Sequence, residues 1–129
     1  MLFRSAYSTP HHVSVDKENY EIVVEGMRQS VIDGTCRLAN SRDYLVCGKT
    51  GTAQNRGIDH SVFMGFAPMD DPQIAIAVYV ENGGFGAVFG VPIGALMMEQ
   101  YITGELSEAS KRKVEDYSSR VIDYGEEER

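Results

Sequence analysis

The residues of this sequence best suited to chemistry are four consecutive ones, Lys49, Thr50, Gly51 and Thr52, called here the Lys-Thr-Gly-Thr motif. Side chains alternate along a strand, so Thr50 and Thr52 would present two hydroxyl groups to the same side. Gly51 has no Cβ and lets a ligand approach closely, and Lys49 supplies a positive charge for an anionic group. Backbone N–H groups at the end of a strand can also stabilise a developing oxyanion. The alternative is a solvent-facing strand lysine followed by a glycine bulge.

Three strand-like segments must position this motif, and they cover residues 44–52, 60–67 and 73–80. The third is apolar almost throughout, which predicts burial on both of its faces. The links between the segments are short. Because a parallel crossover needs about a dozen or more residues, we expect an antiparallel meander.

A helix is expected before the strands, over residues 17–32. Asp16 is its expected N-cap, because a carboxylate can accept hydrogen bonds from the free amides of a first turn. Gly34 is expected to end the helix in the left-handed conformation. Apolar side chains recur at every fourth position and predict one buried stripe. These side chains are Val23, Met27 and Val31.

A second, apolar helix is expected after the strands, over residues 91–102, with Gly104 as its terminator. Residues 105–129 are rich in charged side chains and are expected to form a solvated tail with at most short helical turns. The predicted division is therefore residues 1–104, which hold helix, meander and helix, and a charged tail over residues 105–129. The predicted fold class is α+β, an antiparallel sheet of at least three strands covered by helices.

The charge and hydropathy of the chain exclude several kinds of partner. Its net charge is −7, whereas a nucleic-acid-binding domain normally presents a basic face. No apolar run approaches the ~20 residues that span a bilayer. The first residues have neither the apolar core nor the cleavage site of a signal peptide. We therefore expect no nucleic-acid partner and no targeting signal in this chain.

The motifs that follow the Lys-Thr-Gly-Thr motif resemble those of class B penicillin-binding proteins, especially the elongation-type penicillin-binding protein 2. The next strand ends in Gly65-Phe66-Ala67-Pro68, and the strand after it runs into Glu81-Asn82-Gly83-Gly84. Upstream, Glu25-Gly26-Met27 and Gly34-Thr35 are also similar to the family. The resemblance covers about residues 10–103. It implies that the chain is the C-terminal part of a transpeptidase domain with a penicillin-binding/β-lactamase-like fold.

The resemblance implies acyl transfer in the parent protein. A serine of the family attacks a D-Ala-D-Ala peptide stem of peptidoglycan, releases D-Ala and passes the acyl group to the amine of a neighbouring stem. β-Lactams acylate the same serine. By resemblance, Lys49 contacts a Ser-x-Asn hydroxyl network, and Thr50 and Thr52 bind the substrate or β-lactam carboxylate. The Thr52 amide is one half of the oxyanion hole, and Gly51 leaves room for the acyl chain.

The resemblance also implies a setting for the parent protein. That protein is expected in the inner (cytoplasmic) membrane with its catalytic domain in the periplasm, and it needs no cofactor. The expected partners of this chain are the remainder of the transpeptidase domain, peptidoglycan peptide stems and β-lactams.

The family's nucleophile is not identified in this chain. A Ser-x-Asn sequence is absent, and the family places its Ser-x-x-Lys serine well upstream of the Lys-Thr-Gly-Thr motif. Ser14 and Lys17 fit Ser-x-x-Lys but lie too near the motif, so Ser14 is interpreted as a serine at the start of a helix. Ser110 and Lys113 fit the same pattern but follow the motif. The isolated chain is therefore expected to be catalytically inert.

Two further patterns are interpreted structurally. Residues 84–90 contain three glycines between a strand and a helix, as in a dinucleotide-binding loop. No strand is expected afterwards to complete a βαβ unit, so this segment is interpreted as a flexible connection. The three histidines, His11, His12 and His60, lack the spacing of a metal site, and no metal is expected.

Some questions stay open at this point. Cys36 and Cys47 are interpreted as separate thiols with Cys47 buried in a strand, although pairing is an alternative. The alternative function is a non-catalytic, stand-alone binding or structural module that keeps the same sheet. A sheet without the rest of its domain would leave apolar surface and a strand edge uncovered, so self-association is expected, for example by strand exchange.

Overall fold

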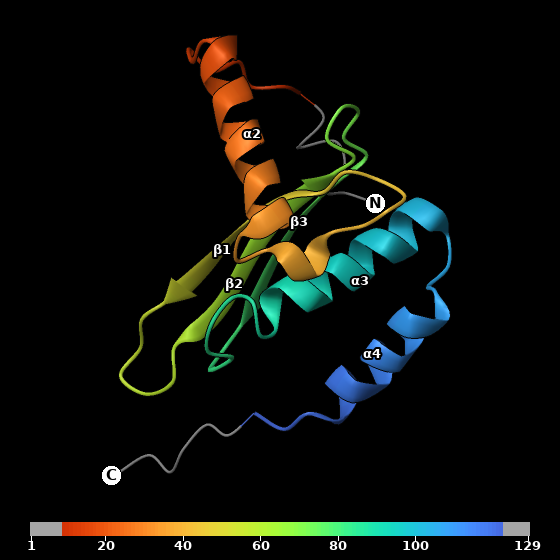
Figure 1. Cartoon of the computed structure of the whole chain (residues 1–129). Helices are drawn as coiled ribbons and strands as arrows, with labels where there is room; N and C mark the ends of the chain where they lie inside the picture. The colour runs from red at the N-terminus through yellow and green to blue at the C-terminus, as the bar shows by residue number, and fades with distance from the viewer. Residues whose placement is uncertain (1–8, 123–129) are drawn as a thin grey trace.

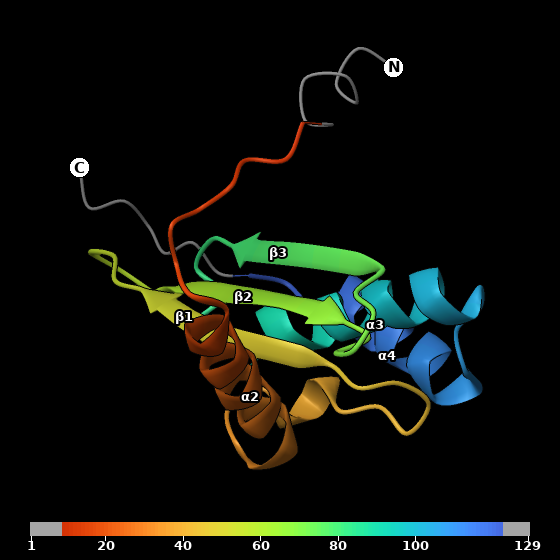
Figure 2. The same cartoon turned by 90° about the horizontal axis from the view of Figure 1, so that it is seen from above.

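The computed structural model describes residues 9–122, which form one sheet with helices around it. Figure 1 shows α2 projecting away from the sheet and α4 lying beside α3. Seen from above in Figure 2, the strands lie side by side with α2 next to β1. The elements, in chain order, are α2 (Lys17–Asp33), η1 (Arg37–Ala39), β1 (Cys47–Ala53), β2 (His60–Ala67), β3 (Ile74–Val80), α3 (Gly90–Thr103) and α4 (Glu108–Ser119).

The sheet is the predicted antiparallel meander, with strand order β1-β2-β3. Phe63 in the central strand pairs with Thr50 on one side and with Val78 on the other. The second strand has the predicted bounds, whereas the first begins at Cys47, three residues later than expected. The α+β fold class is confirmed.

The prediction that β3 is buried on both faces is wrong. Its residues alternate between half-buried and exposed along the strand. Ile74, Ile76 and Val78 pack against the core, while Tyr79 on the opposite face is 59% exposed. The described elements leave that opposite face largely uncovered, so an apolar strand here does not imply two buried faces.

The core lies between the sheet and α3, and Phe63 is its largest fully buried side chain. Burying such a ring contributes about 2 kcal/mol. α3 approaches the sheet closely because Gly94 faces this ring: a Cβ on Gly94 would lie 2.5 Å from Phe63 Cδ1. The buried members of the core cluster are Val31, Cys36, Ala39, Val46, Phe63, Ala67, Val91 and Met98.

The ends of α2 differ from expectation. Asp16 is the N-cap residue, but its side chain makes no capping hydrogen bond. Gly34 ends the helix with extended backbone, at φ −107°, and not in the left-handed conformation. Glycine is needed there for space, since a Cβ would lie 2.8 Å from Ser30 Cα. Gly104, the predicted terminator of α3, does adopt the left-handed conformation at φ 83°.

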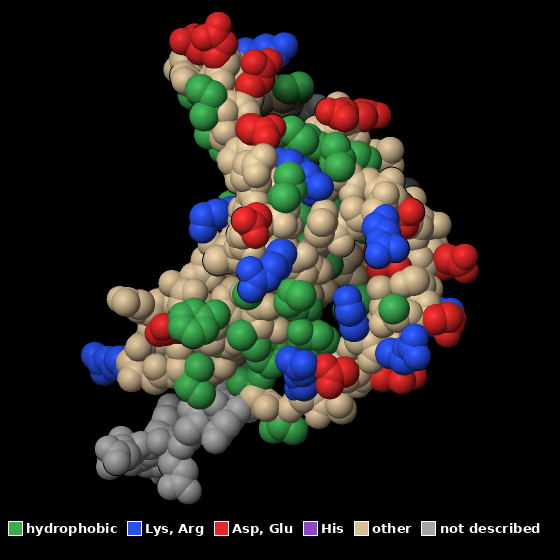
Figure 3. Space-filling view, in the orientation of Figure 1, with side chains coloured by type: hydrophobic (Ala, Val, Ile, Leu, Met, Phe, Trp, Pro, Cys, Tyr) green, Lys and Arg blue, Asp and Glu red, His purple; other side chains and the backbone are tan. Residues whose placement is uncertain are grey.

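The apolar stripe of α2 is buried only toward the end of the helix. Val31 is fully buried and Met27 is half-buried, but Val23 is 59% exposed. Ile22, in the same part of the helix, is 71% exposed. Figure 3 shows hydrophobic side chains exposed along the projecting part of the molecule that holds α2. The outer half of α2 therefore has an apolar surface without a partner in the described chain.

Residues Glu108–Ser119 form the helix α4, where a solvated tail with short turns was expected. Ser107 caps this helix by accepting a hydrogen bond from the Ser110 amide. Glu99 of α3 then receives hydrogen bonds from the Ser107 amide and the Ser110 hydroxyl. Polar contacts, which leave no apolar pattern in the sequence, thus hold the start of α4. The division of the chain at residue 104 stays a prediction.

A search of the described helices for a segment with the length and hydropathy of a bilayer span finds none.

Candidate functional site

The Lys-Thr-Gly-Thr motif lies on β1, which is an edge strand of the described sheet because it pairs only with β2. Thr50 and Thr52 pair with Phe63 and Ser61 and share their face of the sheet. Lys49 and Gly51 lie on the opposite face. Two hydroxyl groups therefore stand on one side of an edge strand whose outer backbone groups pair with no other described strand.

The Thr50 hydroxyl is held by Thr35, which follows α2. The two side-chain oxygens are 2.6 Å apart, so one hydroxyl donates to the other. Thr50 is half-buried, whereas Thr35 and Thr52 are exposed. Sequence reasoning noted Thr35 as part of a family-like pair but did not predict this contact, because the two residues come from different elements.

The Lys49 side chain is exposed and bends back along its own strand. Its Nζ donates a hydrogen bond of 2.8 Å to the Thr50 carbonyl. Within residues 9–122 it forms no ion pair. The ammonium charge is therefore available to an anion that approaches β1.

The connection between β3 and α3 lies against the motif. A Cβ placed on Gly86 would be 2.9 Å from Thr50 Cβ and 2.9 Å from the Gly51 carbonyl oxygen. Only glycine fits so close a contact between a loop and a strand.

Buried Ser61 tethers this connection at both of its ends. The Ser61 hydroxyl donates to the Phe85 carbonyl at 2.9 Å and accepts from the Gly90 amide at 3.0 Å. Sequence reasoning interpreted residues 84–90 as a flexible connection, whereas the structure ties it to β2. The glycines at Gly86 and Gly90 serve packing against strands, and no described strand follows to complete a dinucleotide-binding unit.

Neither serine that fits Ser-x-x-Lys hydrogen-bonds to the motif within the described residues. Ser14 is exposed in the segment before α2, and Lys17 pairs with Glu21 at 3.5 Å. The hydroxyl of Ser110 donates to Glu99. Among residues 9–122, therefore, neither of these two serines is linked to the motif.

The histidine and cysteine candidates that the structure describes make structural contacts. The His60 ring accepts a hydrogen bond from the Asn82 amide at 3.0 Å. Groups of three or more metal-ligand side chains do not occur in the part of the chain that the structure describes. Cys36 and Cys47 are separate, buried thiols. Burial raises the pKa of Cys47 above that of an ordinary thiol.

Comparison with known proteins gives consistent matches. Residues 5–99 match the family described as penicillin binding protein transpeptidase domain. The peptidoglycan D,D-transpeptidase MrdA of Haemophilus influenzae is 31% identical over an alignment of 114 residues, and the match covers 74% of this chain and 18% of that protein. MrdA of Acinetobacter baumannii is 42% identical over an alignment of 80 residues, and that match covers 46% of this chain and 12% of that protein.

Solved structures give the same result. PBP2 of Pseudomonas aeruginosa, in complex with WCK 5153, matches 78% of this chain with a TM-score of 0.63 and 40% identity. The D,D-transpeptidase domain of a peptidoglycan glycosyltransferase from Eggerthella lenta matches 71% of this chain with a TM-score of 0.60 and 30% identity. These matches cover 23% and 22% of the two solved chains. The chain thus spans less than a fifth of the two curated relatives and under a quarter of the two solved chains.

Proposed function

The chain belongs to the penicillin-binding protein transpeptidase family, with relatives of the penicillin-binding protein 2 type, and from this premise we propose that it supplies one wall of a transpeptidase active site. One observation carries the proposal. The Lys-Thr-Gly-Thr motif lies on an open edge strand, with the hydroxyl of Thr50 oriented by Thr35 at 2.6 Å. Such an edge offers hydroxyl and backbone N–H groups together to an acyl ligand that carries a carboxylate.

The proposed chemistry is serine acyl transfer between peptidoglycan stems. A serine outside this chain attacks the carbonyl carbon of the D-Ala-D-Ala bond, and the carbonyl oxygen gains the negative charge. The Thr52 amide donates to that oxygen as one half of an oxyanion hole. The C–N bond then breaks and D-Ala leaves. The amine of a neighbouring stem attacks the acyl-serine ester, which forms the new amide and frees the serine.

Each residue of the motif has a role in this proposal. Thr50 and Thr52 hold the carboxylate of the substrate or of a β-lactam. Gly51 leaves space for the acyl chain, since the strand has no side chain there. The exposed ammonium group of Lys49 joins the Ser-x-Asn hydroxyl network of the remaining domain. No cofactor takes part.

Membership of the family supports a proposed setting for the parent protein. The parent protein is proposed to be anchored in the inner membrane with its catalytic domain in the periplasm. The remainder of the transpeptidase domain is the first partner of this chain, and it supplies the Ser-x-x-Lys and Ser-x-Asn residues. Peptide stems and β-lactams are the ligands.

Incubation of this chain with a fluorescent penicillin tests the division of the active site. We expect no stable label, because the nucleophile and its base lie outside the chain. Stable labelling of Ser14 or of any other residue would overturn the proposal, and mass spectrometry of tryptic peptides locates the adduct.

Self-association of the isolated chain is a second proposal. The strand β3, with sequence IAIAVYV, has neither a charge nor a proline, and β2 is its only described neighbour. An uncharged apolar edge is a template for pairing with another strand. Light scattering over a concentration series is expected to show dimers or larger species. A monomer at every concentration would contradict this proposal, as would a Ala77→Lys variant that associates as strongly as the wild type.

A further inference from the structure

Helix α4 contacts the rest of the chain at its two ends. Its start is held by Glu99, as described above. Its end is held through Tyr117 and Arg120. Between these two points lies a cavity of about 880 Å³, lined by side chains of α3, of α4 and of residues 38–44. α4 therefore bridges two points of the molecule and does not pack along its whole length.

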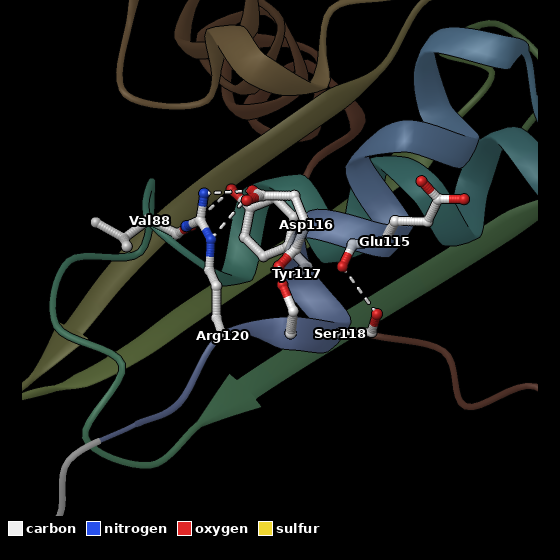
Figure 4. A network of polar contacts seen from close by, with 7 residues as sticks. Val88, Glu115, Asp116, Tyr117, Ser118 and Arg120 are labelled. Carbon is white, nitrogen blue, oxygen red and sulfur yellow. Dashed lines mark hydrogen bonds and ion pairs between the residues drawn. The ribbon is translucent and has the colours of Figure 1, made fainter.

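The end of α4 makes a specific contact with the β3–α3 connection. The Tyr117 hydroxyl donates to the Val88 carbonyl at 2.9 Å, as Figure 4 shows. The Tyr117 ring packs edge-on against Phe89, with ring centroids 5.8 Å apart. The two residues lie 29 positions apart in the sequence, so this hydrogen bond joins α4 to a distant segment of the chain.

Arg120 fixes the orientation of the Tyr117 ring. Its guanidinium carbon lies 4.1 Å from the centroid of that ring and 5.7 Å from the centroid of Phe89. Asp116 holds the guanidinium in place at 2.6 Å, one turn earlier in the chain (Figure 4). A cation over an aromatic face is favourable, so these three side chains support one another and present a single hydroxyl to the connection.

The connection transmits this contact to β1. The Val88 amide donates to Phe85 at 2.9 Å, and the Val91 amide donates to Gly86 at 2.9 Å. Val88 is thus part of the same tight turn as Gly86. Gly86 in turn lies against Thr50 and Gly51, in contact too close for any Cβ.

We propose that Tyr117 is a positioning residue, which holds the β3–α3 connection through Val88 and thereby fixes the space beside Thr50 and Gly51. α4 lies outside residues 5–99, the part that matches the transpeptidase family. The positioning stands on the contacts alone, and its consequence for an acyl group beside β1 rests on the function proposed above.

The test compares Tyr117→Phe with the wild-type chain by amide NMR. The variant keeps the ring, its packing on Phe89 and the Arg120 contact, but it loses the hydrogen bond to Val88. We expect hydrogen exchange at the Val88 and Val91 amides to become about two- to tenfold faster, the factor that corresponds to one ordinary hydrogen bond. The amide signals of Thr50 and Gly51 are expected to shift, although no atom that contacts them has been changed.

Tyr101→Phe is the matched control, because Tyr101 is 61% exposed on α3 and its hydroxyl forms no hydrogen bond within the described residues. It is expected to leave both exchange and signals unchanged. Shifts confined to α4 in Tyr117→Phe, with Thr50 and Gly51 unmoved, would overturn the proposal. None of these readouts involves penicillin, so a failure of the proposed function leaves them interpretable.

Discussion

Two glycines inside helices give opposite predictions for the same substitution. A Cβ at Gly94 of α3 would lie 2.5 Å and 2.6 Å from two ring carbons of the fully buried Phe63. A Cβ at Gly26 of α2 would meet nothing within 4 Å. Alanine favours a helix over glycine by about 1 kcal/mol, whereas overpacking a core costs about 1–3 kcal/mol. We therefore expect Gly94→Ala to lower the free energy of unfolding by about 1 kcal/mol and Gly26→Ala to raise it by up to ~1 kcal/mol.

Urea denaturation followed by circular dichroism measures this difference. With a denaturant slope of about 1–3 kcal/mol per M, the unfolding midpoints of the two variants are expected to differ by roughly 1 M, with wild type between them. Each variant serves as a control for the other, because both make the same change in backbone entropy and differ only in the space around the new Cβ. A Gly94→Ala variant at least as stable as wild type would refute the close approach of α3 to Phe63. A destabilised Gly26→Ala variant would refute the exposure of α2 at Gly26.

Three further predictions concern single side chains. Hydrogen bonds from Ser110 and Ser107 lower the pKa of Glu99 despite the opposing effect of burial, so the stability they add is present near neutral pH and is lost as the pH falls below the ordinary value of 4.5. In Glu99→Gln the urea midpoint is expected to fall less between pH 6 and pH 3 than it does in the wild type. The same dependence of the midpoint on pH in both proteins would contradict this. Cys36 and Cys47 are buried, free thiols. Ellman's reagent at pH 8 is expected to react with them slowly in the native chain and to titrate both of them in urea without a reductant. A count of zero thiols per chain in urea would indicate a disulfide. Thr35→Val removes the hydrogen-bond partner of the Thr50 hydroxyl, so we expect the free energy of unfolding measured in urea to fall by about 1 kcal/mol. Thr35→Ser keeps a hydroxyl at this position and is expected to recover most of that loss.

The sheet and the place of the motif were predictable because they depend on patterns within short segments. Apolar runs separated by short links allow only an antiparallel meander, and β2 has the predicted bounds. The alternation of side chains likewise placed Thr50 and Thr52 on one face, as the pairing with β2 shows. The roles of these residues in catalysis stay predictions, because no contact among the described residues tests them.

The features that sequence reasoning missed depend on contacts between distant segments. Gly34 has the residue type of a left-handed cap, but close contact with Ser30, not backbone conformation, requires glycine there. Ser61 reads as an ordinary strand residue, yet it ties down both ends of the β3–α3 connection.

The helix α4 was missed for a related reason. Its sequence is mostly charged, and the side chains that dock it are polar or lie at its last turn. Tyr117 was the one aromatic signal there, and nothing local indicates that it reaches back to Val88. This segment thus lacks the periodic apolar face that usually indicates a docked helix.

The central claim is that this chain supplies a working wall of a transpeptidase active site, and a hybrid protein tests it most directly. The chain replaces the matching segment of PBP2 from Pseudomonas aeruginosa, to which it is 40% identical over the 78% of the chain that matches, and the rate of acylation by a fluorescent penicillin is measured. We expect the hybrid to be labelled at the serine of the PBP2 part and Lys49→Ala in the hybrid to be labelled at least tenfold more slowly, a loss of about 1.4 kcal/mol in transition-state stabilisation. A folded hybrid that takes no label, or one that Lys49→Ala leaves unchanged, would contradict the account.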